Sequence, residues 1–305
     1  MEEIYKVLPQ KLSKMIIEKY LNENITEIRL RLNQNAILFI DNKEYILEYL
    51  VTRKDILELL SLVSNNSIYA IEDNLKCGYV TIRGGHRIGV CGELAIENGK
   101  VLSMKNINSL NIRVAHEKIG VSNKIMRYII SEKEIKNTLI VSSPGMGKTT
   151  LIRDIARNLS NGFESLDFKG VNVGIVDERG EIAASSLGDF GLDVGKRTDV
   201  ITNVTKSKGM EMMIRSMGLK VIITDEIGAK EDIEAIKYAV SSGVKCIFTM
   251  HGKDFEDILR NKELADIIEE GIFENVIMLS DKNGIGTIEK IHKITFGRDY
   301  KEVAS

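Results

Sequence analysis

The chain has 305 residues, of which 43% are hydrophobic and 28% are charged, and its formal net charge is -2. This composition is typical of a soluble globular protein and excludes a disordered chain, and the length predicts about two domains. The near balance of 42 basic and 44 acidic residues gives no overall attraction to a nucleic-acid backbone, so protein or small-molecule partners are favoured.

The three cysteines have no Cys-x-x-Cys spacing, so neither a disulfide framework nor a zinc site is indicated. The first residues are acidic where a signal peptide needs positive charge. No apolar run approaches the roughly 20 residues that span a bilayer. We therefore expect a cytoplasmic protein without a transmembrane segment, which is recruited peripherally to any membrane complex on which it works.

The amino-terminal part of the chain mixes helices and strands. KLSKMIIEKYL, residues 11–21, spaces its apolar residues as a helix does, and residues 27–32 alternate strictly between apolar and charged side chains, which predicts a half-buried strand. The other expected elements are a strand at 36–40, a helix at 53–63 and strands around glycines at 79–94. These elements predict a smaller α+β amino-terminal domain, which we assign to residues 1–120.

Beyond residue 120, short apolar runs alternate with helical segments. Near-continuous runs of apolar and β-branched residues are typical of strands buried on both faces of a parallel sheet. Such strands are expected at 138–142, 172–177, 220–225, 245–250 and 274–279, and helices at 124–131, 148–159, 209–219 and 230–240. With a linker at 117–123, this pattern predicts an α/β domain over residues 121–298. A polar tail that packs little is expected at 299–305.

SSPGMGKTT, residues 142–150, is close to the GxxxxGK[ST] pattern of a phosphate-binding loop, although Ser142 replaces the first glycine. Glycines are needed because backbone N–H groups must approach the phosphates closely, and two glycines of the stretch meet this need. A strand is expected before the loop and a helix after it, which disfavours a chance glycine turn. The predicted ATP-binding residues are Ser143, Pro144, Gly145, Met146, Gly147, Lys148, Thr149 and Thr150. Lys148 is expected to reach the β- and γ-phosphates, and the Thr149 hydroxyl to bind Mg²⁺.

VIITDEIG, residues 221–228, has four apolar residues followed by two carboxylates, which is the layout of a Walker B strand. Asp225 is expected to hold Mg²⁺ through water, and Glu226 to polarise the attacking water as a general base. The alternative is that both acids only provide negative charge at the start of the next helix. The phosphate loop upstream favours the catalytic interpretation.

Polar residues also end two other expected strands. Thr249 and His251 end one of them, where a hydroxyl and an imidazole are candidates to sense the γ-phosphate, and a loop or surface role is the alternative for the histidine. Asp177 and Glu178 end the other and are candidates to orient water or magnesium. Two arginines in nearby loops are candidates to neutralise charge that develops on the phosphates, with pairing to nearby acids as the alternative: Arg179 and Arg197.

The order of these motifs resembles the ATPases of type II and type IV secretion systems and pilus motors, most closely their sporulation-specific member. The resemblance covers nearly the whole chain and is carried by ITEIRLRL, SSPGMGKTT, VDERGE, TDEIG and TMHG. It implies a RecA-type P-loop ATPase domain, with a mostly parallel sheet, behind a smaller amino-terminal domain. It also implies a homo-oligomeric, hexameric ring, in which ATP lies between the two domains and next to a neighbouring subunit.

The resemblance also implies roles for single residues. VDERGE is similar to the aspartate box of these ATPases, which puts Asp177 and Glu178 near the magnesium, and TMHG is similar to their histidine box, which marks His251. Many of these motors have glycine where Asp225 stands, so the general base is either Glu226, which we expect, or Glu178. Amino-terminal arginines contact phosphate in such motors, and the candidates here are Arg29, Arg31, Arg87 and Arg113. For Arg29 and Arg31 the alternative is that they are solvated residues on the outer face of an alternating strand.

We therefore expect a Mg²⁺-dependent ATPase that powers assembly of, or transport through, a membrane-spanning sporulation complex, whose membrane proteins are its partners. One alternative is a nucleic-acid-translocating ATPase. It would need a basic channel with aromatic residues, whereas aromatics are 6% of the chain and no run of lysine or arginine is longer than a pair, so we expect no nucleic-acid partner. The other alternative is a nucleotide-controlled switch with slow turnover.

Overall fold

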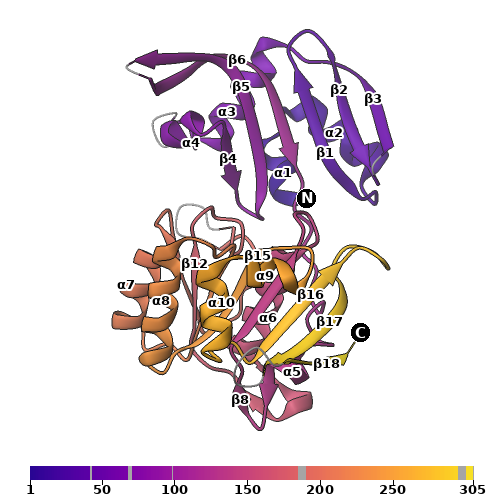
Figure 1. The fold of residues 1–305 in the computed structure, drawn as a ribbon. Helices are drawn as coiled ribbons and strands as arrows, with labels where there is room; N and C mark the ends of the chain where they lie inside the picture. Colours follow the sequence, from indigo (N-terminus) through magenta and orange to yellow (C-terminus); the bar gives the residue numbers. More distant parts are fainter. Residues whose placement is uncertain (42, 68–70, 98, 185–189, 295–299, 305) are drawn as a thin grey trace. The chain divides into compact units, whose positions relative to one another are not determined.

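The computed structural model describes residues 1–305 except 42, 68–70, 98, 185–189, 295–299 and 305 (Figure 1). The chain divides into two compact units. The first consists of Met1–His116 with Ala184–Gly191, and the second of Glu117–Ala183 with Leu192–Ser305. No helix in the described part of the chain has both the length and the apolar character needed to cross a membrane.

The first unit is a six-stranded antiparallel sheet in the order β3-β2-β1-β6-β5-β4, with helices against one face. In β1, Ile28 and Leu30 are buried in the same core as the helices, and the alternating Arg29 and Arg31 lie on the opposite face. Its elements are α1 (Glu2–Val7), α2 (Gln10–Tyr20), β1 (Ile25–Arg31), β2 (Asn35–Ile40), β3 (Lys43–Leu50), α3 (Arg53–Val63), α4 (Glu72–Lys76), β4 (Tyr79–Ile82), β5 (His86–Glu97) and β6 (Lys100–Arg113).

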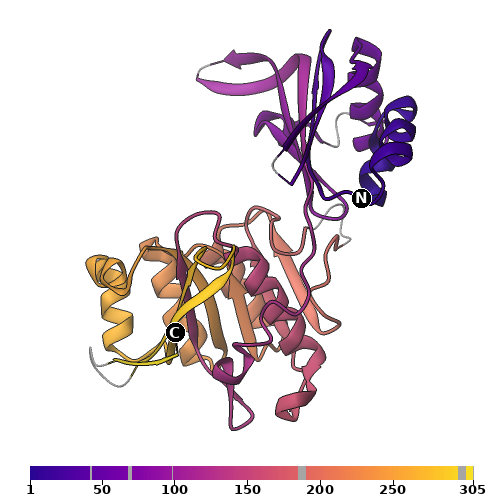
Figure 2. The same ribbon diagram turned by 90° about the vertical axis from the view of Figure 1, so that its right-hand side faces the viewer.

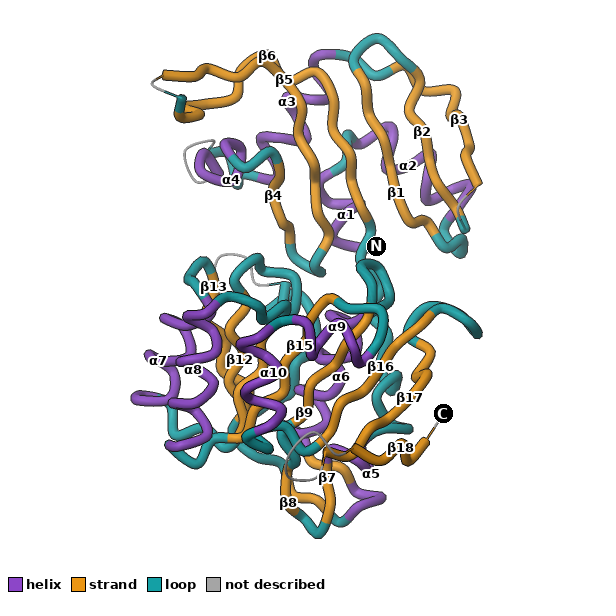
Figure 3. The backbone as a smooth tube through the Cα atoms, in the orientation of Figure 1, coloured by secondary structure: helices purple, strands orange, loops and turns teal. Residues whose placement is uncertain are grey.

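The second unit is built on an eight-stranded sheet in the order β13-β12-β14-β15-β9-β16-β17-β18 (Figure 3). The strands from β13 to β16 are parallel, and β17 and β18 continue the sheet as antiparallel strands. The strands of this sheet are β9 (Thr138–Ser142), β12 (Val173–Asp177), β13 (Thr198–Thr202), β14 (Val221–Thr224), β15 (Lys245–His251), β16 (Asn275–Ser280), β17 (Thr287–Ile294) and β18 (Tyr300–Ala304).

Two apolar cores cover the two faces of this sheet, which explains the near-continuous apolar runs. Leu139 and Val141 of β9 belong to one core, together with residues of α7, α8 and α10, and Ile140 belongs to the other, together with residues of α6. The helices and small elements are α5 (Met126–Ile129), β7 (Ile130–Ser131), β8 (Glu134–Ile135), α6 (Lys148–Asn161), β10 (Gly162–Phe163), a 3₁₀ turn (Glu164–Leu166), β11 (Phe168–Lys169), α7 (Lys206–Ser216), α8 (Lys230–Ser241), α9 (Phe255–Arg260) and α10 (Lys262–Glu269).

The structure differs from the sequence prediction at the edges of this sheet. The tail expected to pack little contains Tyr300–Ala304, which forms β18 and pairs with β17. A polar strand gains backbone hydrogen bonds at an open sheet edge without an apolar sequence of its own. The helix expected at 124–131 is the short α5, and the chain then turns into β7 at Ile130.

The segment predicted as a linker is attached to α6 by one buried carboxylate. Asp154 accepts hydrogen bonds from the backbone N of Gly120 at 3.0 Å and of Ser122 at 2.8 Å, and from the Ser122 hydroxyl at 2.8 Å. Arg157 Nη2 also donates to Asp154, at 2.7 Å. Burial alone would raise the pKa of Asp154, but these hydrogen bonds outweigh it and hold the pKa below its ordinary value.

Asp154→Ala is therefore expected to lower the free energy of unfolding at pH 7 by about 3 kcal/mol, because it leaves the Gly120 and Ser122 donors and Arg157 without their acceptor. Because the folded-state pKa is lowered, this contribution is complete above the unfolded value of about 4 and is lost as the pH falls through the folded-state value. Urea unfolding of the wild type and of Asp154→Ala should therefore show a difference in the free energy of unfolding that becomes smaller in acid. A difference that stays constant down to low pH would contradict the role of the charge.

Candidate functional site

The predicted phosphate loop lies between the end of β9 and the start of α6. Gly145 and Gly147 have φ values of 79° and 84°, a left-handed conformation that glycine adopts without strain. Ser142, which replaces the first glycine of the motif, is the buried last residue of β9 and pairs in register with His251 of β15. A small residue in a regular strand position therefore causes no conflict there.

Lys148 is the first residue of α6 and its side chain turns back over the loop. Its Nζ lies 3.1 Å from the Ser142 carbonyl oxygen, 3.3 Å from that of Ser143 and 3.0 Å from His251 Nδ1. Lys148 is only 5% exposed, and burial lowers the pKa of its ammonium group although the charges of Asp225 and Glu226 oppose this. The ammonium group is therefore held by neutral acceptors beside the loop that the sequence predicts to bind phosphates.

His251 connects this lysine to the carboxylate predicted as the general base. Because its Nδ1 faces the donor Lys148, we assign the proton to Nε2, which lies 2.8 Å from Glu226 Oε1. Arg179 Nη1 lies 3.4 Å from the other oxygen, Glu226 Oε2. A continuous polar chain thus runs from the phosphate loop through His251 to Glu226 and Arg179.

Two threonines hold the carboxylate of Asp225, which directly follows β14. Thr149 Oγ1 donates to Asp225 Oδ2 at 2.7 Å, and Thr249 Oγ1 donates to Asp225 Oδ1. The backbone N of Glu226 donates to the same Thr249 hydroxyl at 2.9 Å, which fixes Glu226 in a left-handed conformation with φ 47°. Such a conformation is costly for a residue other than glycine, so the bond to Thr249 determines where the Glu226 side chain points.

The residues present fit a magnesium ion at this point. In phosphate-transfer sites Mg²⁺ is bound by one or two side chains, while phosphate oxygens and water complete its shell. The adjacent Thr149 hydroxyl and Asp225 carboxylate supply such a pair. Among the described residues no cluster of three or more His, Cys, Asp or Glu side chains could hold a metal ion.

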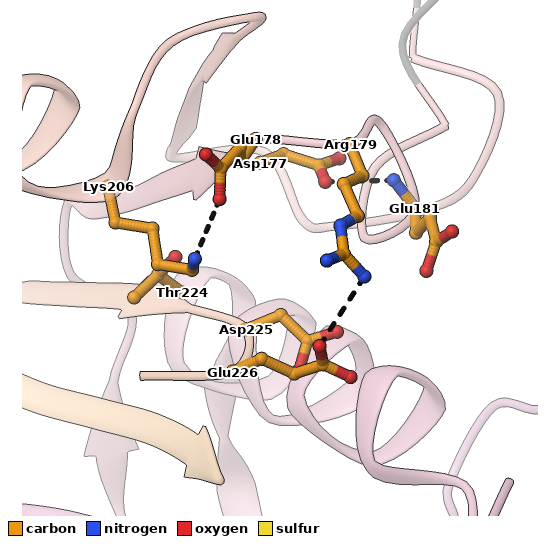
Figure 4. A pocket seen from close by; sticks show the side chains of 8 residues that line it. All are labelled: Asp177, Glu178, Arg179, Glu181, Lys206, Thr224, Asp225 and Glu226. Atoms are coloured by element: carbon orange, nitrogen blue, oxygen red, sulfur yellow. Dashed lines mark hydrogen bonds and ion pairs between the residues drawn. The ribbon is translucent and has the colours of Figure 1, made fainter. Parts of the chain in front are cut away.

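A pocket lies beside Asp225 and Glu226, and Figure 4 shows its side chains. Lys206 and Glu178 point toward one another across it, with Lys206 Nζ 2.6 Å from Glu178 Oε2. Lys206 is a functional-site residue that the sequence analysis missed, because no local motif marks the first residue of α7. Only the pairing of β13 with β12 brings it beside Glu178. The pocket is lined by Asp177, Glu178, Arg179, Glu181, Lys206, Thr224, Asp225 and Glu226.

Asp177, at the end of β12, has its oxygens engaged by the backbone. It is 2% exposed and accepts hydrogen bonds from the backbone N of Glu181 at 2.8 Å, of Ile182 at 3.0 Å and of Ala183 at 2.9 Å. Burial raises the pKa of this carboxyl although these hydrogen bonds oppose the change. Asp177 therefore shapes the loop that presents Glu178 and Arg179.

The phosphate loop, Asp225, Glu226, Glu178 and His251 all lie at the carboxyl ends of neighbouring parallel strands, the edge where α/β sheets bind ligands. The four amino-terminal arginines belong to β1, β5 and β6 of the first unit.

Arg197, which we predicted to bind the nucleotide, is not part of this site. It precedes β13, whose first residue Thr198 pairs with Val173, the first residue of β12, so Arg197 lies at the amino end of the strands. Its Nη1 donates to the Ser160 carbonyl oxygen at 2.8 Å, at the end of α6. The prediction is wrong because the sequence analysis took the region around β13 for a loop and so could not tell which edge of the sheet Arg197 occupies.

Arg197→Gln is accordingly expected to change the ATP affinity by less than about twofold. It should lower the free energy of unfolding by about 1 kcal/mol, because the bond to Ser160 is lost. Nucleotide titration and urea unfolding measure the two effects. Lys196→Gln removes the same charge from the adjacent exposed residue and is the control. A tenfold loss of ATP affinity in Arg197→Gln alone would restore Arg197 to the site.

Comparisons with known proteins agree with this geometry. The family model described as Sporulation stage III, protein AA matches residues 1–297. The chain is 40% identical over 294 residues to Stage III sporulation protein AA of Bacillus subtilis (strain 168), which covers 96% of this chain and 95% of that protein.

Two solved structures show the same fold at low sequence identity. The ATPase DotB of Yersinia pseudotuberculosis matches with a TM-score of 0.61 and 11% identity, over 94% of this chain and 80% of that one. The pilus retraction motor PilT with bound ADP matches with a TM-score of 0.59 and 17% identity, over the same shares. The predicted fold class, a RecA-type domain with a mostly parallel sheet behind a smaller α+β domain, is confirmed.

Proposed function

The chain belongs to the sporulation stage III protein AA family, as its motifs suggested, and from this premise we propose that it is a Mg²⁺-dependent ATPase of the secretion-motor type. The observation that carries the proposal is the shared edge of the sheet. There Lys148 and Thr149 follow β9, Asp225 and Glu226 follow β14, and His251 ends β15, the strand between these two.

Each of these residues has a part in phosphoryl transfer to water. The loop N–H groups and Lys148 would bind the β- and γ-phosphates, with Lys148 exchanging its present carbonyl acceptors for phosphate oxygens. Thr149 and Asp225 would hold Mg²⁺, which neutralises charge on the phosphates when it is bound. His251 contacts both Lys148 and Glu226, and it would sense whether phosphate has replaced the imidazole as the partner of Lys148.

We assign Glu226 as the general base. Its carboxylate faces the phosphate loop through His251, and a base must lie within hydrogen-bond reach of the water it activates. Glu178 is the alternative base, and its carboxylate is engaged by Lys206 in the pocket of Figure 4. Arg179, which already contacts Glu226, would neutralise charge that develops on the phosphates.

The proposal extends to a homo-oligomeric, hexameric ring that works at the cytoplasmic side of a membrane-spanning sporulation complex and contacts its membrane proteins. Membership of a sporulation family and a fold shared with a pilus retraction motor support it. Hydrolysis would be converted into rigid-body movement, because contacts made to the γ-phosphate are lost after cleavage.

The test measures steady-state ATPase activity against protein concentration, with molar mass from light scattering in the same samples, with and without ATP. Activity per subunit is expected to rise steeply as rings form. The activity of Lys148→Ala, measured in the same way, is subtracted as the background. Activity that is flat in concentration and comes from a monomer would favour the slow nucleotide switch. Salt-sensitive stimulation by single-stranded DNA would favour a nucleic-acid translocase.

A further inference from the structure

One face of the sheet in the first unit is basic and carries none of the helices that the structure describes. Helices α1 and α2, drawn in indigo in Figure 2, lie on one side of the sheet, where they share a core with the inward residues of the strands. The outward residues pair in register across β1, β6 and β5, as Glu27 with Arg113 and Arg87, and as Arg29 with Asn111 and Gly89. Arg31, two residues further along β1, lies on the same face, so four arginines share it with Glu27.

A hollow is sunk into this face. Arg29 and Arg31 line it from β1, and Ser109 and Asn111 line it from β6. Two residues without a side chain, Gly78 and Gly89, also line it. All of these residues belong to the first unit, and none of them is among the residues that line the pocket beside Asp225 and Glu226.

Two polar groups in this hollow are unsatisfied. The Oδ1 atom of Asn111 is buried and accepts no hydrogen bond, a costly state in a folded protein. The Arg31 guanidinium has no ion-pair partner in the part of the chain that the structure describes. Arg29, in contrast, pairs with Glu27 and lies over the Phe39 ring. The hollow thus offers one unpaired cation and one unpaired acceptor.

These groups select the chemistry of a ligand. Arg29 and Arg31 are two residues apart on one strand face, roughly 7 Å, and an extended polypeptide with acidic residues at positions i and i+2 presents carboxylates at the same spacing. Its backbone N–H groups can donate to Asn111 Oδ1, whereas ionised phosphate groups only accept hydrogen bonds. None of the described residues that line the hollow is aromatic, so no ring is available to stack on a nucleotide base.

We propose that this hollow binds an extended acidic segment of a protein partner, with two carboxylates on Arg29 and Arg31 and a backbone N–H on Asn111. The hollow shares no residue with the pocket beside Asp225 and Glu226. Binding of the partner therefore does not depend on ATP hydrolysis, and the test below separates the two.

The test is fluorescence anisotropy of the full chain with a labelled peptide of about ten residues that alternates glutamate and alanine. Saturable binding that weakens with salt is expected, because the contacts are charged. A peptide with glutamine in place of glutamate should bind at least about tenfold more weakly, since bidentate arginine–carboxylate bonds are lost. A peptide with the same number of glutamates in adjacent pairs tests the spacing and should also bind more weakly. Equal binding of the glutamine peptide would overturn the proposal.

Variants assign the binding to the hollow. Arg31→Gln should weaken binding of the glutamate peptide about tenfold. Arg31→Lys keeps the charge but not the bidentate geometry, and it should weaken binding less. Asn111→Leu should weaken binding while raising the melting temperature, because it removes the unsatisfied buried acceptor. Lys14→Gln, on the exposed side of α2, removes the same charge outside this face and should bind like the wild type.

ATP and inorganic phosphate are tested as competitors in the Lys148→Ala background, where the phosphate loop is disabled. Neither should displace the peptide at concentrations near those that saturate the wild-type nucleotide site. Displacement by either would make the hollow a general anion or nucleotide site and overturn the peptide proposal. An Arg31→Gln protein that folds normally and binds like the wild type would overturn it as well.

Discussion

Lys148→Ala is expected to abolish tight ATP binding, with a loss of about 10² to 10³ in affinity, and to leave the fold intact. Lys148 is the one ammonium group that the structure places inside the phosphate loop among the residues it describes, and its Nζ is held there by two carbonyl oxygens and His251. Removing one partner of a buried, charge-assisted contact costs about 2–5 kcal/mol, which corresponds to this loss. Calorimetric titration with ATP and magnesium measures it.

The stability of the same variant should change little, by about 1 kcal/mol, because burial already lowers the pKa of Lys148 and its contacts replace those with water. Lys133→Ala is the matched control. This lysine of the same unit is 68% exposed and pairs with Asp167, so its loss should affect neither binding nor folding. Affinity retained in Lys148→Ala, with a normal circular dichroism spectrum, would mean that SSPGMGKTT does not bind phosphate.

The parts of the fold that could be predicted are those whose signal is local. Strands β9, β12, β14, β15 and β16 are buried on both faces and therefore appear in the sequence as apolar runs. In the first unit the alternation in β1 marks its buried face. Helix α3 occupies the predicted residues, and its start is fixed by a local capping box between Thr52 and Asp55.

Several of the strands that were missed have little apolar pattern of their own. Strand β13 alternates only weakly and is held by its pairing with β12. Strands β17 and β18 are half-polar, and β18 forms the sheet edge. No local window distinguishes such strands from loops, because their hydrogen bonds are made with strands elsewhere in the chain. The tail that contains β18 was expected to pack little for this reason.

The residues of the candidate site also fall into two groups, those that local motifs predict and those that only the fold brings together. The glycines and Lys148 of the loop, and the acidic pair after β14, follow from short motifs with a known mechanism. The contact between Lys148 and His251 joins residues 103 positions apart, and it follows only from the pairing of β9 with β15. Lys206 and Arg197 both flank β13, and without that strand the sequence could place neither.

Glu226→Gln is expected to leave ATP bound but to slow hydrolysis by about 10² to 10⁴, or about 3–5 kcal/mol of barrier. Glutamine has nearly the same shape and preserves the backbone bond to Thr249, so the loop and the Mg²⁺ ligands stay in place. What is lost is the capacity of the carboxylate to accept a proton from water. Single-turnover hydrolysis, measured with affinity for ATP in the same preparation, separates the loss of chemistry from a loss of binding.

Glu178→Gln distinguishes the two carboxylates that compete for this role. Its side chain is paired with Lys206 across the pocket, so losing its charge should slow turnover by less than about tenfold, chiefly by releasing Lys206. If the effects are reversed, with Glu226→Gln near wild type and Glu178→Gln inactive, Glu178 is the base and Glu226 positions His251.

Equal and large losses in both would mean that the two carboxylates act on one water together. The double variant would then be no slower than either single one, because groups that act as a unit are not additive.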